Sequence, residues 1–156
     1  MTKPSILIVP GAFGLPDFYD LIVGQIRALG HDIRALKLPS VSATPVPPEG
    51  PLPTIYDDAA AVAEAAEKLA DEGKDVILFA HSYGGVVTSQ STKGLSKAER
   101  QKQGKKGGIV RLAFMTTLVP DIGVSAGSLL ADVPPELKLD LKPDVRFPAS
   151  LVCSPN

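Results

Sequence analysis

The sequence predicts an α/β fold in which a mostly parallel sheet carries helices on both faces. Short apolar runs end in turn-forming residues, amphipathic helical patterns separate these runs, and the two alternate along the chain. Strands covered on both faces are continuous apolar runs, and their alternation with helices favours parallel strands joined by right-handed crossovers. We expect a single domain over 1–156, with its core at 1–121 and an irregular tail or the start of a cap at 122–156.

The first strand and the first helix are the clearest elements. Residues 6–9 form a run rich in β-branched side chains, and Pro10 and Gly11 end it. Apolar residues at helical spacing follow Pro16, whose missing N–H is tolerated at the first helical position. Gly30 is expected to end this helix as a C-cap.

The later elements repeat the alternation of strand and helix. A proline-rich stretch at 39–53 cannot continue a helix or a ladder, so we expect a long irregular surface loop. Ser96 and Glu99 form a capping-box pattern that opens a short charged helix, which Gly104 ends. The remaining expected strands are 33–38, 76–80 and 110–118, and the remaining expected helices are 57–72 and 84–92.

The composition excludes several classes of partner. Sixteen Lys and Arg against seventeen Asp and Glu give a net charge of −1, so we expect no nucleic-acid partner. The apolar runs are far shorter than the roughly 20 residues that span a bilayer, so we expect no membrane partner. No secretory signal precedes the first strand, and the single cysteine, Cys153, cannot form an internal disulfide, which together favour a soluble, cytoplasmic protein. No residue pattern predicts a metal or a cofactor.

The segment LFAHSYGGVV, residues 78–87, places a histidine and a serine at the end of an apolar run. Ligands of parallel sheets bind outside the carboxyl ends of the strands, and Ser82 is expected at that edge. A strand-to-helix turn sharp enough to project Ser82 crowds its neighbours, so small residues are needed two positions before and after it. Ala80 and Gly84 meet this need, and Gly85 lets the following helix pack closely. The pattern predicts a nucleophile elbow.

Two backbone N–H groups are candidates for an oxyanion hole. A serine that attacks a carbonyl creates an oxyanion, and two preorganised N–H donors are expected to bind it. One is the N–H of Tyr83, which follows the nucleophile. The other is the N–H of Ala12, because Gly11 lets the backbone of the first turn approach closely. The Tyr83 side chain is expected either to contact substrate or to pack beside the elbow.

Five short motifs carry a resemblance to a known family. They are IVPGA at 8–12, ALGHD at 28–32, LPS at 38–40, AHSYGG at 80–85 and FMTTLVP at 114–120. In this order they resemble the α/β-hydrolase superfamily, and most of all its esterase branch, which includes plant methylesterases and hydroxynitrile lyases. Residues 94–100 are similar to fungal members.

This resemblance implies a partial α/β-hydrolase fold and a serine hydrolase that acts on small carboxylic esters through an acyl-enzyme, without a cofactor. It implies that Ser82 is the nucleophile and that Ala12 and Tyr83 supply the oxyanion hole. Pro10 replaces the histidine that often precedes the glycine of this turn, and Ala80 replaces the first glycine of the elbow. Neither change removes an N–H that the site needs.

The chain offers no obvious general base. The family places an acid and a histidine after later strands, but no histidine follows His81. His31 precedes the second strand, so we expect it at the opposite edge of the sheet, roughly 20 Å from Ser82. Neighbouring side chains at a strand end point to opposite sides, so His81 is expected to buttress the elbow. Asp121 follows the fourth strand, where some hydrolases keep their acid, although most loop aspartates are simply solvated.

Three functions remain open on the sequence alone. The first is a serine esterase that further sequence completes, since the domain is expected to be incomplete at its C-terminal end. The second is an inactive or ligand-binding member, and the third is a lyase that uses Ser82 as a base. A plainer interpretation is that Ser82 only caps the helix after it. An incomplete sheet is also expected to leave the fourth strand as an exposed apolar edge that favours homo-oligomers.

Overall fold

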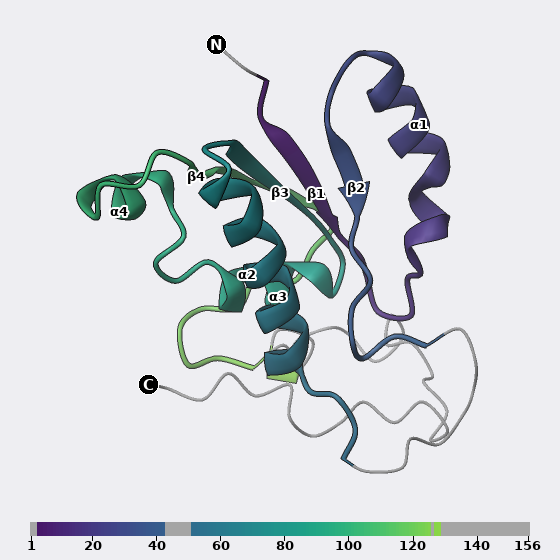
Figure 1. The fold of residues 1–156 in the computed structure, drawn as a ribbon. Coiled ribbons are helices and arrows are strands. Elements are labelled where there is room, and N and C mark those ends of the chain that lie inside the picture. Colours follow the sequence, from purple (N-terminus) through teal and green to yellow (C-terminus); the bar gives the residue numbers. More distant parts are fainter. Residues whose placement is uncertain (1–2, 43–50, 126, 129–156) are drawn as a thin grey trace.

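The structure, a computed structural model, describes residues 3–42, 51–125 and 127–128. Expectations for 129–156, including Cys153, lie outside the described residues. The strands are β1 (Ser5–Val9), β2 (Ile33–Ala35), β3 (Asp75–His81) and β4 (Gly108–Met115). They form one parallel sheet in the order β2–β1–β3–β4, which confirms the predicted α/β class (Figure 1). The first strand therefore lies inside the sheet, next to the strand that carries the elbow.

Helices cover both faces of this sheet, as expected. They are the short 3-10 helix η1 (Pro16–Tyr19), α1 (Asp20–Ala28), α2 (Ile55–Asp71), α3 (Gly84–Ser91) and α4 (Lys97–Lys102). Figure 1 shows α1 on one side of the strands and α2 and α3 on the other, while α4 packs beside β4. None of the described helices is long and apolar enough to cross a bilayer.

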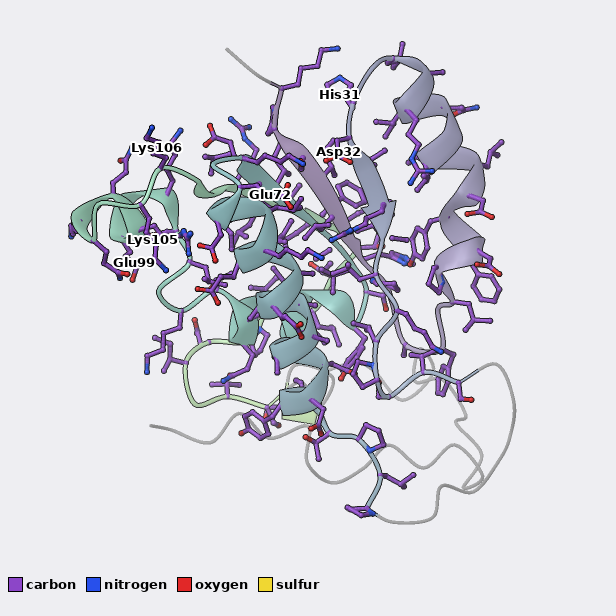
Figure 2. The ribbon with its side chains drawn as sticks, in the orientation of Figure 1. His31, Asp32, Glu72, Glu99, Lys105 and Lys106 are labelled. Atoms are coloured by element: carbon purple, nitrogen blue, oxygen red, sulfur yellow. The ribbon has the colours of Figure 1, made fainter. Side chains whose placement is uncertain are left out.

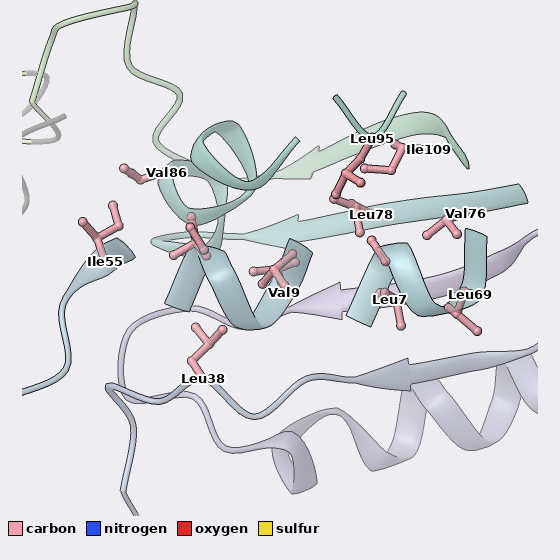
Figure 3. Packing of buried hydrophobic residues seen from close by; sticks show 14 of the residues in the cluster. Leu7, Val9, Leu38, Ile55, Leu69, Val76, Leu78, Val86, Leu95 and Ile109 are labelled. Carbon is pink, nitrogen blue, oxygen red and sulfur yellow. The ribbon is translucent and has the colours of Figure 1, made fainter. Parts of the chain in front are cut away.

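Side chains of β1 alternate between two hydrophobic clusters. Leu7 and Val9 join Leu78 of β3 in the larger cluster, which α2 and α3 cover (Figure 3). Ile8 points the other way and joins Val23 of α1 in the smaller cluster. Each of the three β1 side chains is at most 1% exposed, and full burial of such a side chain contributes about 1.5–3 kcal/mol. The packing on both faces fixes β1 and hence the position of the turn that follows it.

Two strands end earlier than the sequence predicts. The prediction for the second strand, 33–38, is too long: β2 ends at Ala35, and the hydrogen bond from the Leu36 N–H to the Ile8 carbonyl, at 2.9 Å, is followed by a turn in which the carbonyl of the fully buried Leu38 accepts from the Val41 N–H. The prediction for the fourth strand, 110–118, is shifted, because Thr116 has a φ of 46° and this left-handed conformation ends the ladder. Both strands nevertheless lie where the alternation placed them.

The start of α2 also differs from the prediction. The sequence predicts a helix from residue 57, but the structure begins it at Ile55. Thr54 is the N-cap: its hydroxyl accepts a hydrogen bond from the Tyr56 N–H at 3.2 Å. The Asp57 carboxylate in turn accepts from the Thr54 N–H at 2.6 Å, which completes a capping box.

The exposed fourth strand predicted from the sequence is present in the described part of the chain. β4 is the edge strand, and Val110, Phe114 and Met115 are 39–43% exposed. Among the described residues, the outer side of β4 is paired at its beginning, where the Ile109 N–H donates to the Leu95 carbonyl at 2.8 Å. Association of a second copy along this edge stays a prediction.

Candidate active site

Ser82 occupies a sharp turn between β3 and α3. Its φ is 51°, in the left-handed region that residues other than glycine rarely adopt. Such a conformation costs about 1–3 kcal/mol and persists only where the surroundings impose it. The Ser82 carbonyl accepts hydrogen bonds from Gly85 and Leu118, at 3.1 and 3.3 Å, and its N–H donates to the Met115 carbonyl at 3.4 Å. These bonds to β4 and to the segment after it hold the turn in place.

Strained backbone gathers at the carboxyl ends of three neighbouring strands. In the described part of the chain, Phe13, Ser82 and Thr116 are the residues other than glycine with positive φ. They follow β1, β3 and β4 respectively, which are adjacent in the sheet. Because strain of this kind clusters at functional sites, its position agrees with the edge where the sequence places the site.

The two glycines after the elbow are required by close backbone contacts. A Cβ on Gly84 would lie 2.3 Å from the carbonyl oxygen of Val9 in β1, and one on Gly85 would lie 2.5 Å from that of Leu118. Both distances are shorter than any tolerated contact of a side chain. Ala80, two positions before Ser82, is fully buried. The small residues that the sequence singled out are therefore those that let the first turn of α3 cross the sheet edge.

The turn after β1 lies directly against the elbow. A Cβ built on Gly11 would be 3.1 Å from the Cβ of Ser82. Ala12, the next residue, carries one of the predicted oxyanion donors, and Tyr83 carries the other. Among the described residues, neither the Ala12 N–H nor the Tyr83 N–H donates a hydrogen bond to the protein. Two backbone N–H groups without an acceptor among the described residues thus flank Ser82.

His81 is engaged on the side of the sheet that faces α1. Its Nδ1 lies 2.9 Å from the Tyr19 hydroxyl oxygen, and the two rings meet edge to face with centroids 6.1 Å apart. The Tyr19 hydroxyl also accepts from the Gly11 N–H at 3.2 Å. His81 therefore has a structural hydrogen bond, as the sequence predicted.

Tyr83 is anchored on the opposite side by a buried carboxylate. Its hydroxyl donates to Asp58 Oδ2 at 2.9 Å. Asp58 is fully buried and also accepts from the Ser40 N–H at 2.9 Å and the Ser40 hydroxyl at 2.6 Å. Burial, and secondly the Asp58 charge, raise the pKa of the Tyr83 phenol far above its ordinary value. Of the two roles left open for this side chain, the structure supports packing beside the elbow.

Sequence reasoning missed Tyr19, Ser40 and Asp58. A signal for Asp58 was present, because it lies three residues after Ile55 and four before Val62, on the buried stripe of α2. A carboxylate on an apolar helix face needs partners. Tyr19 offers no comparable signal, since an aromatic residue at a helix start usually belongs to the core.

His31 is the other candidate base and Asp121 is the candidate acid. His31 sits at the amino end of the sheet, beside Asp32, whose carbonyl accepts from the Ile6 N–H at 2.7 Å (Figure 2). This confirms its predicted place at the edge opposite Ser82. Asp121 is exposed, and its carbonyl accepts from the Val124 N–H at 3.0 Å. Within the ranges that the structure describes, no cluster of three His, Cys, Asp or Glu could hold a metal ion.

Comparison with known proteins gives the same class as the fold and the elbow. The model of the alpha/beta hydrolase family matches residues 6–152. Alpha/beta hydrolase nvfD of Aspergillus novofumigatus is 36% identical over 139 residues, which cover 88% of this chain and 53% of that protein. Probable hydrolase R7 of a Phoma species is 31% identical over 143 residues, covering 90% of this chain and 53% of that protein. The chain belongs to the alpha/beta hydrolase family.

A solved structure agrees at the level of the fold. The H243A variant of tomato methylketone synthase I, complexed with beta-ketoheptanoate, superposes with a TM-score of 0.62 at 22% identity. The match covers 86% of this chain and 51% of that protein. The chain therefore spans about half the length of the relatives it matches.

The contact between Gly84 and the Val9 carbonyl gives a stability prediction. We expect Gly84→Ala to lower the free energy of unfolding by about 3 kcal/mol, because the backbone must shift to admit the methyl group. Gly24→Ala on α1 is the matched control: nothing lies within 4 Å of its Cβ position, and alanine favours helix by about 0.5–1 kcal/mol. Urea unfolding of the two variants measures the difference. Equal stabilities would contradict the close contact.

The raised pKa of Tyr83 gives a pH prediction. The unfolded phenol loses its proton at about pH 10, while the folded one retains it to higher pH. The contribution of the protonated Tyr83 phenol to the free energy of unfolding is therefore complete below about pH 10 and is lost as the pH rises above that value. Urea unfolding at about pH 8 and about pH 11 should show a larger loss for the wild-type protein than for Tyr83→Phe. An equal loss in the wild-type protein and in Tyr83→Phe would refute the assignment.

Proposed function

We propose that this chain carries the nucleophile and the oxyanion hole of a serine hydrolase that acts on carboxylic esters. The observation that carries the proposal is the left-handed backbone of Ser82 at the strand–helix junction, with a φ of 51°. A serine that only caps a helix has an extended backbone and needs no such strain. The close contacts at Gly84 and Gly85 support the proposal, because they place the first turn of α3 against the sheet edge and leave the change of direction to Ser82.

The geometry supports a two-step reaction. Ser82 Oγ attacks the ester carbonyl carbon and loses its proton to a base, which then protonates the departing alcohol. The carbonyl oxygen gains negative charge, and the N–H groups of Ala12 and Tyr83 are the donors proposed to bind it. Water then hydrolyses the acyl-serine and releases the acid. One such donor is worth about 10²–10³ in rate.

The proposal requires a histidine base, and neither of the two histidines in the sequence is placed to serve Ser82. His31 lies at the far end of the sheet, and the Nδ1 of His81 is hydrogen-bonded to Tyr19. Because the chain spans about half the length of its relatives, we propose that the base and its acid come from polypeptide outside the matched half. Without them the Ser82 hydroxyl is a weak nucleophile, and loss of a triad histidine costs on the order of 10⁶ in turnover.

A second candidate function follows from the positions of the two histidines. With neither histidine free to serve Ser82, the chain by itself fits a ligand-binding member of the family that retains the elbow and its amides. Such a protein would bind carbonyl compounds at the Ala12 and Tyr83 amides without forming an acyl-serine.

A fluorophosphonate probe separates these two functions. We expect intact-mass analysis to show one phosphonyl group on Ser82, slowly in this chain and faster in a longer product of the same gene. Ser82→Ala should abolish the adduct, whereas Ser96→Ala, which removes a cap from α4 far from the elbow, should retain it. Absence of any adduct on Ser82 in both polypeptides would overturn the esterase proposal and favour the ligand-binding one.

A further inference from the structure

A side chain that the proposed chemistry does not use connects the two turns of the site. Tyr19 ends η1, and its ring packs against the smaller hydrophobic cluster with Ile8, Val23 and Ile33. Its hydroxyl lies between the turn after β1 and the last residue of β3. It contacts the Gly11 N–H at 3.2 Å and His81 Nδ1 at 2.9 Å.

The hydrogen-bonding capacity of a phenol fixes the direction of these two bonds. A tyrosine hydroxyl has one proton and accepts at its lone pairs, and a backbone N–H can only donate. The Gly11 N–H therefore uses a lone pair of Tyr19, and the phenolic proton remains for His81. Nδ1 of His81 accepts this proton when the neutral imidazole carries its own hydrogen on Nε2. The opposite tautomer would aim two donors at one oxygen and leave the phenolic proton without an acceptor.

We propose that Tyr19 is a positioning residue for the oxyanion hole. It holds the Gly11 N–H and so fixes the Pro10–Gly11 peptide group, which directly precedes the peptide group that carries the Ala12 N–H. It also fixes His81 with Nδ1 as an acceptor, so this nitrogen cannot take the Ser82 proton. The effect on rate rests on the proposed function, whereas the hydrogen bonds themselves do not.

Removal of the hydroxyl isolates this role from packing. Tyr19→Phe keeps the ring in its cluster but leaves the Gly11 N–H and His81 Nδ1 without their partner. Gly11 is buried, so its N–H has little access to water that could replace the bond. The turn should then sample other orientations while the core stays intact.

Nuclear magnetic resonance tests the hydrogen bonds independently of any reaction at Ser82. In the wild-type chain we expect the His81 imidazole nitrogens to report the Nε2–H tautomer and the Gly11 amide to exchange slowly. Tyr19→Phe should mix the tautomers and speed Gly11 exchange about tenfold. Tyr56→Phe, at the start of α2, is the control and should leave both signals as in the wild-type protein. Unchanged His81 and Gly11 signals in Tyr19→Phe would overturn the proposal.

A pair of His81 variants tests the same bond from the other side and serves if Tyr19→Phe fails to fold. His81→Asn places an amide oxygen near the position of Nδ1 and can accept from Tyr19, whereas His81→Leu cannot. We expect Gly11 exchange about tenfold slower in the Asn variant than in the Leu variant, and phosphonylation of Ser82 faster by a similar factor. Equal Gly11 exchange in the two variants refutes the positioning role. This holds even if the two variants differ in the rate of phosphonylation. Absence of phosphonylation in the wild-type chain, in contrast, bears on the proposed function alone.

Discussion

The close approach of α3 to the ends of the strands is the constraint on which the site depends. The first turn of α3 crosses the sheet edge with Gly84 against the Val9 carbonyl and Gly85 against the Leu118 carbonyl. Any side chain at these positions would push the helix outward, and the chain between β3 and α3 could then relax. Because the helix cannot move, Ser82 must make the whole change of direction in one residue, which explains its left-handed backbone. The same approach brings the turns after β1 and β4 against the elbow.

Two hydrogen-bond networks hold the residues on either side of Ser82. His81 is bonded to Tyr19, which packs in the cluster that α1 covers. Tyr83 is bonded to Asp58 of α2, on the opposite face of the sheet. The elbow is thus fixed to the helical layers on both faces rather than to one. Each network reaches one proposed oxyanion donor: Tyr19 holds the residue before Ala12, and Asp58 holds the side chain of Tyr83 itself.

The sequence predicts the parts of this arrangement that depend on local chemistry. Apolar runs and small residues are local patterns, so the four strands, the elbow at Ser82 and the need for Gly84 follow from reading along the chain. The ends of β2 and β4 do not, because they depend on where Leu38 finds a buried site and on the backbone of Thr116. The partners Tyr19 and Asp58 are distant in sequence from the residues they hold, and only the packing of helices on the sheet brings them together.

The central claim is that Ser82 Oγ and the amides of Ala12 and Tyr83 face a common point. The most direct measurement is a crystal structure of the chain with a phosphonyl group bound to Ser82, since the phosphoryl oxygen imitates the oxyanion. The account predicts that this oxygen accepts from both amides at about 2.7–3.1 Å, with Ser82 still in the left-handed region. A phosphoryl oxygen directed away from either amide, or a Ser82 with negative φ, would contradict it.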